Sequence, residues 1–270
     1  MNINPELVER TLIHFIRDEI TKFGFKKAVL GLSGGLDSTV AAYLTSKALG
    51  KNNLIPLIIP YKSSSKKNMD DAIKVAKIVA EKHHIINITE QIDIYFKNNP
   101  TEEKLFIGNK IARERMSIIF DYSAREKAMV IGTSNKTELL LGYGTWFGDL
   151  ASSVNPLGDL YKTQVFQLAA HLKVPEQIIK KTPSADLWPG QTDEEEMGIM
   201  YKIADEILYL IIDKRKSVKD ILDWGYDEDL VFKVLKMVKS SQFKRTMPII
   251  AKLSHRTIGK DFLYPRDWGV

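Results

Sequence analysis

The sequence predicts an α/β protein with a doubly wound parallel sheet and a helical C-terminal part. Short apolar runs alternate with helical segments over about residues 25–160, the pattern of parallel βαβ units. The apolar runs are nearly continuous, as expected for strands that helices cover on both faces. We therefore predict a single domain over residues 1–270, with the α/β core first, a helical part over about 161–255 and an aromatic tail over 256–270.

The first half of the chain supplies the expected sheet. Asn4-Pro5 places a capping residue before a proline in a first helical turn, and Gly24 ends that helix. Buried strands are predicted at Ala28–Ser33, Leu54–Ile59, Ile85–Thr89 and Ala128–Gly132, with a weaker fifth strand near Ser152–Leu157. Helices are expected between them over Leu36–Leu49, Asn68–His83 and Ile107–Lys127.

From Lys162 onward, only helical segments are expected. They are predicted over Thr163–Leu172, Glu176–Lys181, Glu194–Ile212 and Glu228–Ser240. The tail carries three aromatic residues in irregular sequence, Phe262, Tyr264 and Trp268. We expect this tail to dock on a surface, either its own or that of a partner subunit.

Composition removes several classes of chemistry. The chain has 270 residues, 44% of them hydrophobic, and no cysteine, so disulfides, thiolate metal ligands and a cysteine nucleophile are excluded. The N-terminus has no apolar core of a signal peptide, and no uncharged apolar run approaches the length of a membrane span. We expect a cytoplasmic protein with no membrane partner. The net charge of +5 comes with scattered lysines, which favours a solvated surface over nucleic-acid binding.

The clearest local signal is the segment GLSGGLDS, which joins the first expected strand to the next expected helix. Its residues are Gly31, Leu32, Ser33, Gly34, Gly35, Leu36, Asp37 and Ser38. Adjacent glycines can direct successive N–H groups into one concavity, and the helix N-terminus adds positive dipole character, so the segment suits phosphate. Asp37 would repel a phosphate unless Mg²⁺ bridged the two. The segment is neither a Walker A loop nor GxGxxG. A glycine-rich turn without function is the plainer interpretation, and the full SGGxDS pattern disfavours it.

The pattern SGGLDS at Ser33–Ser38 resembles the signature of the ATP pyrophosphatases, which cleave ATP between its α and β phosphates. More distal segments resemble motifs of the NAD synthetases, in the same order and at similar spacing. These segments are Gly108–Met116 (GNKIARERM), Gly132–Glu138 (GTSNKTE), Gly142–Asp149 (GYGTWFGD), Asn155–Leu157 followed by Lys162, and Pro183–Leu187 (PSADL). The resemblance spans about residues 8 to 250 and is closest to ammonia-dependent NAD synthetases.

The resemblance implies a sheet of the adenine nucleotide alpha-hydrolase-like type and a two-step ligase reaction. The carboxylate of deamido-NAD would attack ATP to form an acyl-adenylate, and ammonia would then form the amide of NAD and release AMP. This is the last step of NAD biosynthesis. Glutamine-dependent relatives carry a glutaminase domain with a catalytic cysteine, and this chain has none, so free ammonia is the expected nitrogen donor. The resemblance also implies a homodimer with the dinucleotide at the subunit interface.

The resemblance assigns roles to particular residues. ATP would bind at Gly31–Ser38, Thr133, Lys162 and Ser184; Mg²⁺ at Asp37 and Glu138; and deamido-NAD at Arg113, Asp149 and Lys244. Without the resemblance, Glu138 is a carboxylate in a first helical turn, Lys162 a surface lysine and Ser184 a loop serine. Arg115 is left as a structural residue. Two positions depart from many relatives: Trp146 stands in place of a substrate-binding lysine, and Phe243 in place of a histidine.

Two other functions remain open at this point. A tRNA-modifying ATP pyrophosphatase would share SGGxDS, although the distal motifs argue against it. A non-catalytic nucleotide-binding module on the same fold would leave the two carboxylates, Asp37 and Glu138, without a purpose.

Overall fold

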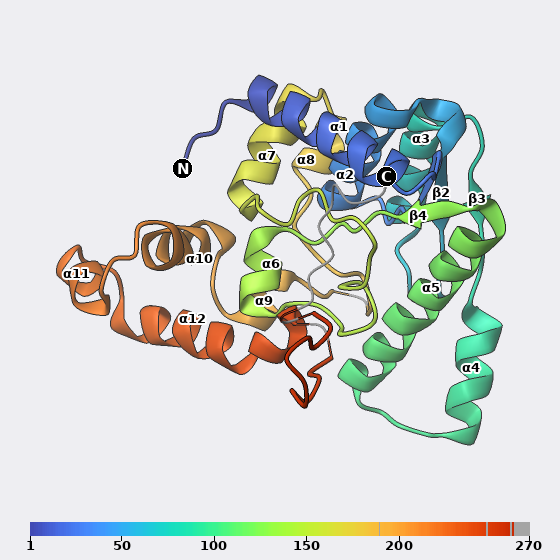
Figure 1. Cartoon of the computed structure of the whole chain (residues 1–270). Coiled ribbons are helices and arrows are strands. Elements are labelled where there is room, and N and C mark those ends of the chain that lie inside the picture. The colour runs from blue at the N-terminus through green and yellow to red at the C-terminus, as the bar shows by residue number, and fades with distance from the viewer. Residues whose placement is uncertain (189, 247, 260, 262–270) are drawn as a thin grey trace.

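A parallel sheet lies at the centre of the protein, for which a computed structural model describes residues 1–188, 190–246, 248–259 and 261 (Figure 1). Within these residues the sheet has four strands in the order β3-β2-β1-β4. Their bounds are β1 Lys27–Gly31, β2 Leu54–Ile58, β3 His84–Ile85 and β4 Ala128–Val130. In the register, Ala28 of β1 pairs with Leu54 of β2 and with Met129 of β4.

The strand order reverses beside β1. The chain first builds β1, β2 and β3 toward one edge, and then crosses to β4 on the opposite side of β1. This crossing uses two helices, α4 Thr89–Asn98 and α5 Lys104–Glu126. In an open parallel sheet, ligands bind outside the carboxyl ends of the strands at such a switch point. The sheet therefore places its binding crevice where β1 and β4 end.

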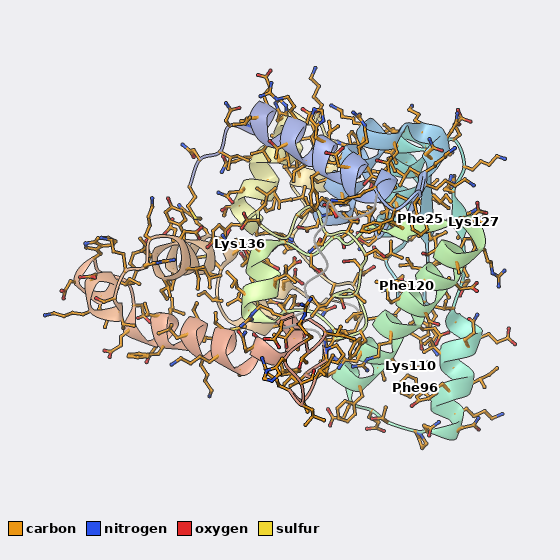
Figure 2. All side chains as sticks on the ribbon, in the orientation of Figure 1. Phe25, Phe96, Lys110, Phe120, Lys127 and Lys136 are labelled. Atoms are coloured by element: carbon orange, nitrogen blue, oxygen red, sulfur yellow. The ribbon has the colours of Figure 1, made fainter. Side chains whose placement is uncertain are left out.

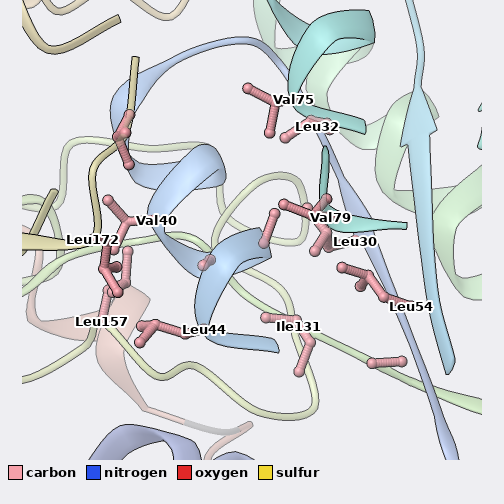
Figure 3. Close-up of a cluster of buried hydrophobic side chains, with 14 of the residues drawn as sticks. Leu30, Leu32, Val40, Leu44, Leu54, Val75, Val79, Ile131, Leu157 and Leu172 are labelled. Atoms are coloured by element: carbon pink, nitrogen blue, oxygen red, sulfur yellow. The ribbon is translucent and has the colours of Figure 1, made fainter. Parts of the chain in front are cut away.

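Helices cover both faces of the sheet. One face packs against α1 Pro5–Thr21, α2 Leu36–Leu49, α3 Lys66–Val79, α7 Lys162–His171 and α8 Glu176–Ile179. Alternate residues of β1 divide between the faces: Ala28 and Leu30 join this cluster, part of which is drawn in Figure 3, whereas Val29 faces α4 and α5. Each fully buried aliphatic side chain stabilises the fold by about 1.5–3 kcal/mol. The near-continuous apolar pattern of β1 follows from this burial on both sides.

A lobe with its own core comprises α6 Lys136–Leu141, α9 Asp193–Met197, α10 Tyr201–Leu208, α11 Val218–Asp223 and α12 Glu228–Ser240. Its helices α10, α11 and α12 lie on the side of the molecule opposite α5, and α6 and α9 lie near the centre (Figure 1). Three shorter helical segments lie at Lys51–Asn53, Tyr209–Asp213 and Gln242–Arg245. The lobe has its own apolar core, to which Leu141, Tyr161 and Val231 contribute.

Within the described part of the chain, no helix combines the length and apolar character needed to cross a bilayer.

The α/β class and the parallel, doubly wound sheet are confirmed, with three local corrections. The third strand is only two residues long, and α4 occupies the following segment, where we predicted no helix. The prediction of a fifth strand near Ser152–Leu157 is wrong, because this segment forms an isolated parallel bridge between Ile131 and Val154. The helix predicted over Glu194–Ile212 is interrupted because Gly198, at φ +60°, ends α9 in the left-handed conformation. The tail residues Phe262, Tyr264 and Trp268 lie outside the described residues.

Candidate active site

A cavity of about 690 Å³ opens where β1 and β4 end. It is bounded by the glycine loop, α5, the segment after β4 and the start of α7. Most of the residues predicted from the motifs line it: Gly31, Leu32, Ser33, Gly35, Leu36, Asp37, Ser38, Thr133, Glu138, Asp149, Lys162, Ser184 and Lys244. Gly34 and Arg113 are not among the lining residues. Tertiary structure thus gathers residues from both halves of the chain at one end of the sheet.

The glycine loop and the first turn of α2 line this cavity. Gly34 has φ +78°, and a Cβ atom at this position would collide with the backbone oxygen of Asn68, so only glycine fits. Ser33 Oγ accepts a hydrogen bond from the Gly35 N–H at 3.2 Å and lies 3.0 Å from Ser38 Oγ. Gly35 caps α2 without a side chain, which leaves the first N–H groups of α2 available to an anion.

Lys162 lies between two carboxylates at the base of the cavity. Its Nζ is 2.6 Å from Asp37 Oδ2 and 3.3 Å from Glu138 Oε1, and its side chain is only 4% exposed. Burial acts to lower the pKa of Lys162, but the two carboxylates outweigh burial and raise the pKa, so the side chain stays cationic. Burial, opposed by Lys162 and reinforced by Asp37, raises the pKa of Glu138 to about 8.

The start of α6 explains why Glu138 lies here. Asn135 caps this helix: its side chain accepts from the Glu138 N–H at 3.0 Å, and Glu138 Oε2 accepts from the Asn135 N–H at 3.2 Å. The Asn135 amide also donates to Asp37 Oδ1 at 2.9 Å. Glu138 is therefore both a helix-capping carboxylate and a cavity residue. Asn135 is a site residue that the sequence reasoning missed, although the N-x-x-E spacing was a usable signal.

A second group of residues missed at the sequence level surrounds Asp193. Its carboxylate accepts hydrogen bonds from the hydroxyls of Tyr143 at 2.9 Å and Tyr201 at 3.0 Å. The Tyr201 ring centre lies 5.0 Å from Lys162 Nζ, a cation–π arrangement. Burial raises the pKa of Asp193 above its usual range. Tyr143 belongs to the GYGTWFGD motif, whereas Asp193 and Tyr201 carried no local signal, because only tertiary packing brings them beside Lys162.

The positions of the two arginines of α5 differ from those expected from the motifs, because Arg115 and not Arg113 lines the cavity. Arg113 is exposed, and its Nε donates to the Trp146 carbonyl at 3.2 Å, so any contact with substrate would be made on the outer side of α5. Arg115 lines the cavity instead, where its Nε donates to the Ile59 carbonyl at 3.0 Å. The assignment of Arg115 as purely structural is therefore incomplete. Helical periodicity could have found it, because Arg115 shares the inner face of α5 with Ile111 and Ile119.

The other two residues expected to bind the dinucleotide lie at the cavity wall. Asp149 Oδ1 accepts from the Thr145 N–H at 2.8 Å. Lys244 Nζ donates to the carbonyl oxygens of Gly142 at 2.7 Å and Gly144 at 2.8 Å. Lys244 thereby ties the C-terminal segment to the loop that carries Asp149.

The two departures from the motifs of many relatives are in contact with each other. The rings of Trp146 and Phe243 meet edge to face with their centroids 5.3 Å apart. Phe147 stacks on Trp146 at 4.5 Å and is largely exposed. An aromatic cluster therefore occupies the region where the motif comparison expected a lysine and a histidine.

Comparison with known proteins gives a consistent result. A family model described as NAD synthase matches residues 8–248. The NH(3)-dependent NAD(+) synthetase of Trichlorobacter lovleyi is 49% identical, covering 100% of this chain and 98% of that protein. The enzyme of the same name from Fusobacterium nucleatum is 50% identical, covering 94% and 98%.

Solved structures agree with this assignment. The NMN synthetase of Francisella tularensis has a TM-score of 0.82 at 32% identity, covering 93% of this chain and 99% of that one. The NH3-dependent NAD synthetase of Campylobacter jejuni has a TM-score of 0.79 at 33% identity, covering 93% and 100%. The chain spans 50% of the glutamine-dependent NAD+ synthetase of Acinetobacter baumannii, with a TM-score of 0.70 at 25% identity. The matched motifs, the sheet with its glycine loop and these likenesses together place the chain in the NAD synthase family.

Proposed function

We propose that this protein uses ATP to amidate deamido-NAD with ammonia, forming NAD, AMP and pyrophosphate. The observation that carries the proposal is the convergence of Lys162, Asp37 and Glu138 beside a glycine loop at the ends of parallel strands. Membership of the NAD synthase family supports it. We infer that the enzyme is cytoplasmic.

The first step is the transfer of AMP to the substrate carboxylate. The carboxylate oxygen attacks the α-phosphorus of ATP, the bond to the bridging oxygen breaks, and pyrophosphate leaves with the electron pair. The N–H groups of the glycine loop and the hydroxyls of Ser33 and Ser38 hold the phosphates. The Lys162 ammonium offsets negative charge as pyrophosphate departs. Thr133 and Ser184, which also line the cavity, would contact the rest of ATP.

The second step forms the amide. Ammonia attacks the activated acyl carbon, AMP leaves with the carbon–oxygen bonding pair, and the nitrogen loses a proton to solvent. The protein positions the reactants and offsets their charge, and it contributes no nucleophilic side chain. This agrees with a sequence that has no cysteine. The same absence removes the thiolate by which glutamine-dependent enzymes release ammonia. Free ammonia is therefore the proposed nitrogen donor.

We propose that Asp37 and Glu138, whose carboxylates both contact Lys162 Nζ, would hold one Mg²⁺ ion. Among the described residues, no cluster of three or more His, Cys, Asp or Glu side chains could hold a metal by itself. Magnesium in nucleotide sites commonly uses one or two carboxylates and completes its shell with phosphate oxygens and water. Magnesium held there would neutralise the phosphates. Its positive charge would also favour the ionised form of Glu138, whose pKa is raised by burial.

The dinucleotide would lie along the wall formed by Asp149 and Lys244 and extend toward Arg113. Because Arg113 is on the exposed side of α5, full recognition of the substrate would need a surface beyond this cavity. A homodimer with the substrate at its subunit interface meets that need. The exposed side chains of Phe106 and Phe120 on α5 are consistent with such an interface; Phe120 is labelled in Figure 2.

One assay tests the function and its alternatives. The purified protein is incubated with ATP, Mg²⁺ and ammonium, together with deamido-NAD, nicotinic acid mononucleotide or tRNA, and AMP and amide products are measured. We expect NAD and AMP in equal amounts with deamido-NAD. Preferential use of the mononucleotide would move the assignment toward the reaction named for the Francisella relative. AMP release that depends on tRNA would support a tRNA-modifying enzyme, and ATP binding without product would support a non-catalytic module.

Glutamine in place of ammonium tests the nitrogen donor. We expect glutamine to support no turnover above the level due to contaminating ammonium. Equal rates with glutamine and ammonium would contradict the proposal.

A further inference from the structure

The side chain of Lys181 borders the cavity and binds the Gly34 carbonyl of the glycine loop. Its Nζ donates to the Gly34 carbonyl at 2.9 Å, to Asn68 Oδ1 at 2.8 Å and to Asp71 Oδ2 at 2.7 Å. Lys181 follows α8, whereas Asn68 and Asp71 belong to α3. One ammonium therefore joins three parts of the chain, and all three of its protons have acceptors.

The position of this ammonium is fixed by a buried carboxylate. Asp71 is only 2% exposed, and its second oxygen accepts from Gln177 Nε2 at 2.6 Å. Both oxygens of Asp71 are thus engaged, so the carboxylate cannot follow Lys181 if the lysine moves. Burial acts to raise the pKa of Asp71, but the hydrogen bond and charge of Lys181 outweigh it, and the pKa is lowered. The Asp71 carboxyl is therefore ionised at neutral pH.

The bonds to the loop hold one peptide group from both sides. The carbonyl of the peptide between Gly34 and Gly35 accepts from Lys181, and its N–H donates to Ser33 Oγ at 3.2 Å. Gly34 has no Cβ atom to resist rotation of this peptide. Without Lys181, the carbonyl could rotate toward the cavity, where its partial negative charge would repel a triphosphate.

The same lysine begins another part of the cavity wall, residues 181–188. The segment that follows it contains Ser184, and this segment docks on the loop before α3: Asp186 Oδ2 accepts from the Ser65 N–H at 2.9 Å, and the Leu187 carbonyl accepts from Ser63 Oγ at 3.1 Å. Lys181 therefore connects the glycine loop to the segment that carries Ser184.

We propose that Lys181 is a positioning residue for ATP, which keeps the Gly34 carbonyl turned away from the triphosphate and holds the two walls of the site together. The proposal rests on the function proposed above, in that it takes ATP to be the ligand of the glycine loop. It predicts a defect in ATP binding and little change in the use of deamido-NAD. A direct contact between the Lys181 charge and a phosphate is the rival explanation.

Two substitutions distinguish these explanations. K181M removes the ammonium, and we expect the Kd for ATP to rise at least about tenfold while the KM for deamido-NAD stays within about twofold. D71N keeps the Lys181 ammonium but removes the negative charge that holds it in position. Positioning predicts that D71N also weakens ATP binding, by about threefold or more, whereas a direct charge contact predicts binding that is unchanged or tighter.

Controls separate these effects from loss of fold. K180M alters the neighbouring lysine, which is 73% exposed and pairs with Glu176, and should bind ATP like the wild type. The double variant K181M/D71N leaves no unpaired charge in the core; it should fold, as judged by circular dichroism, and still bind ATP weakly. Normal ATP binding by K181M or by a folded double variant would overturn the positioning role. Failure of the wild-type protein to bind ATP at all would instead overturn the proposed function, and this inference with it.

Discussion

Lys162 Nζ lies 2.6 Å from Asp37 Oδ2, although 125 positions separate the two residues in the sequence. The ammonium is almost fully buried, and Glu138 supplies a second carboxylate at 3.3 Å. Buried charges are retained when they are paired, and this pairing joins the start of α2, the start of α6 and the start of α7. The arrangement gathers one ammonium and two carboxylates at one point of the cavity.

Replacement of Lys162 by methionine should nearly abolish turnover. K162M removes the cation that offsets charge on the leaving pyrophosphate, and we expect kcat to fall at least about 100-fold. AMP release measures this effect. K136M is a matched control because Lys136, labelled in Figure 2, also contacts two carboxylates, Asp159 and Asp213, but does not line the cavity. K136M should retain at least about half of the wild-type rate. Similar losses in both variants would contradict a specific role for Lys162.

Substitution of Glu138 by glutamine should weaken the use of magnesium. E138Q removes one anionic ligand but keeps a side chain that can cap α6, so the helix should persist. We expect the Mg²⁺ concentration for half-maximal activity to rise at least about tenfold. The measurement is AMP formation against MgCl2 concentration. D159N, at a side chain that is 95% exposed, should leave the titration unchanged. An E138Q titration that overlays the wild type would remove Glu138 from the metal site.

Two glycines with the same backbone conformation allow a direct test of the loop. Gly34 and Gly24 both have φ +78°, but nothing lies within 4 Å of a Cβ atom built on Gly24, whereas at Gly34 that atom would meet the backbone of α3. G24A should cost about 1 kcal/mol in free energy of unfolding from strain alone and leave ATP binding intact. G34A should displace the loop and weaken ATP binding at least about tenfold. Isothermal titration and urea unfolding measure the two effects; equal ATP affinity in both variants would refute the steric argument.

A pH-dependent contribution to stability is expected at Glu9 of α1. Glu9 contacts Lys47 of α2 at 2.5 Å and His171 of α7 at 2.7 Å. Burial acts to raise the pKa of Glu9, but these two partners outweigh it and hold the pKa below its ordinary value of 4.5. A carboxyl with a lowered pKa stabilises the folded state above its unfolded-state pKa and loses that contribution as the pH falls through the folded-state pKa.

The variant E9Q tests this dependence by urea unfolding. We expect E9Q to lower the free energy of unfolding by about 1 kcal/mol at pH 6, and the difference from the wild type to shrink toward pH 3. E176Q removes the exposed pair between Glu176 and Lys180 and should change the free energy by less than about 0.5 kcal/mol at either pH. A difference for E9Q that grows on acidification would show that the sign is wrong.

Short-range pattern was sufficient for much of the fold. The helix over Leu36–Leu49 was predicted with both ends correct, because Gly35 and Gly50 bound an otherwise helical run. The first strand and the glycine loop were readable for similar reasons: a buried apolar run followed by a turn that only glycine can make is a local property. The order of the motifs also indicated the family from sequence alone. The motifs that contain Asp37 and Glu138 each follow an expected strand, and this is again a local property of the chain.

Local sequence could not decide which residues meet. Nothing near Asp193 or Tyr201 indicates that both lie beside Lys162, and nothing near Lys181 indicates that its ammonium holds the Gly34 carbonyl. Arg113 and Arg115 are two positions apart, yet the packing of α5 against the sheet exposes one and turns the other into the cavity. Propensity and periodicity act over a few residues, whereas the pairing of buried charges depends on contacts between distant segments. The amino-acid pattern therefore determined the α/β class, the phosphate loop and the family, and the packing of helices on the sheet decided which side chains form the site.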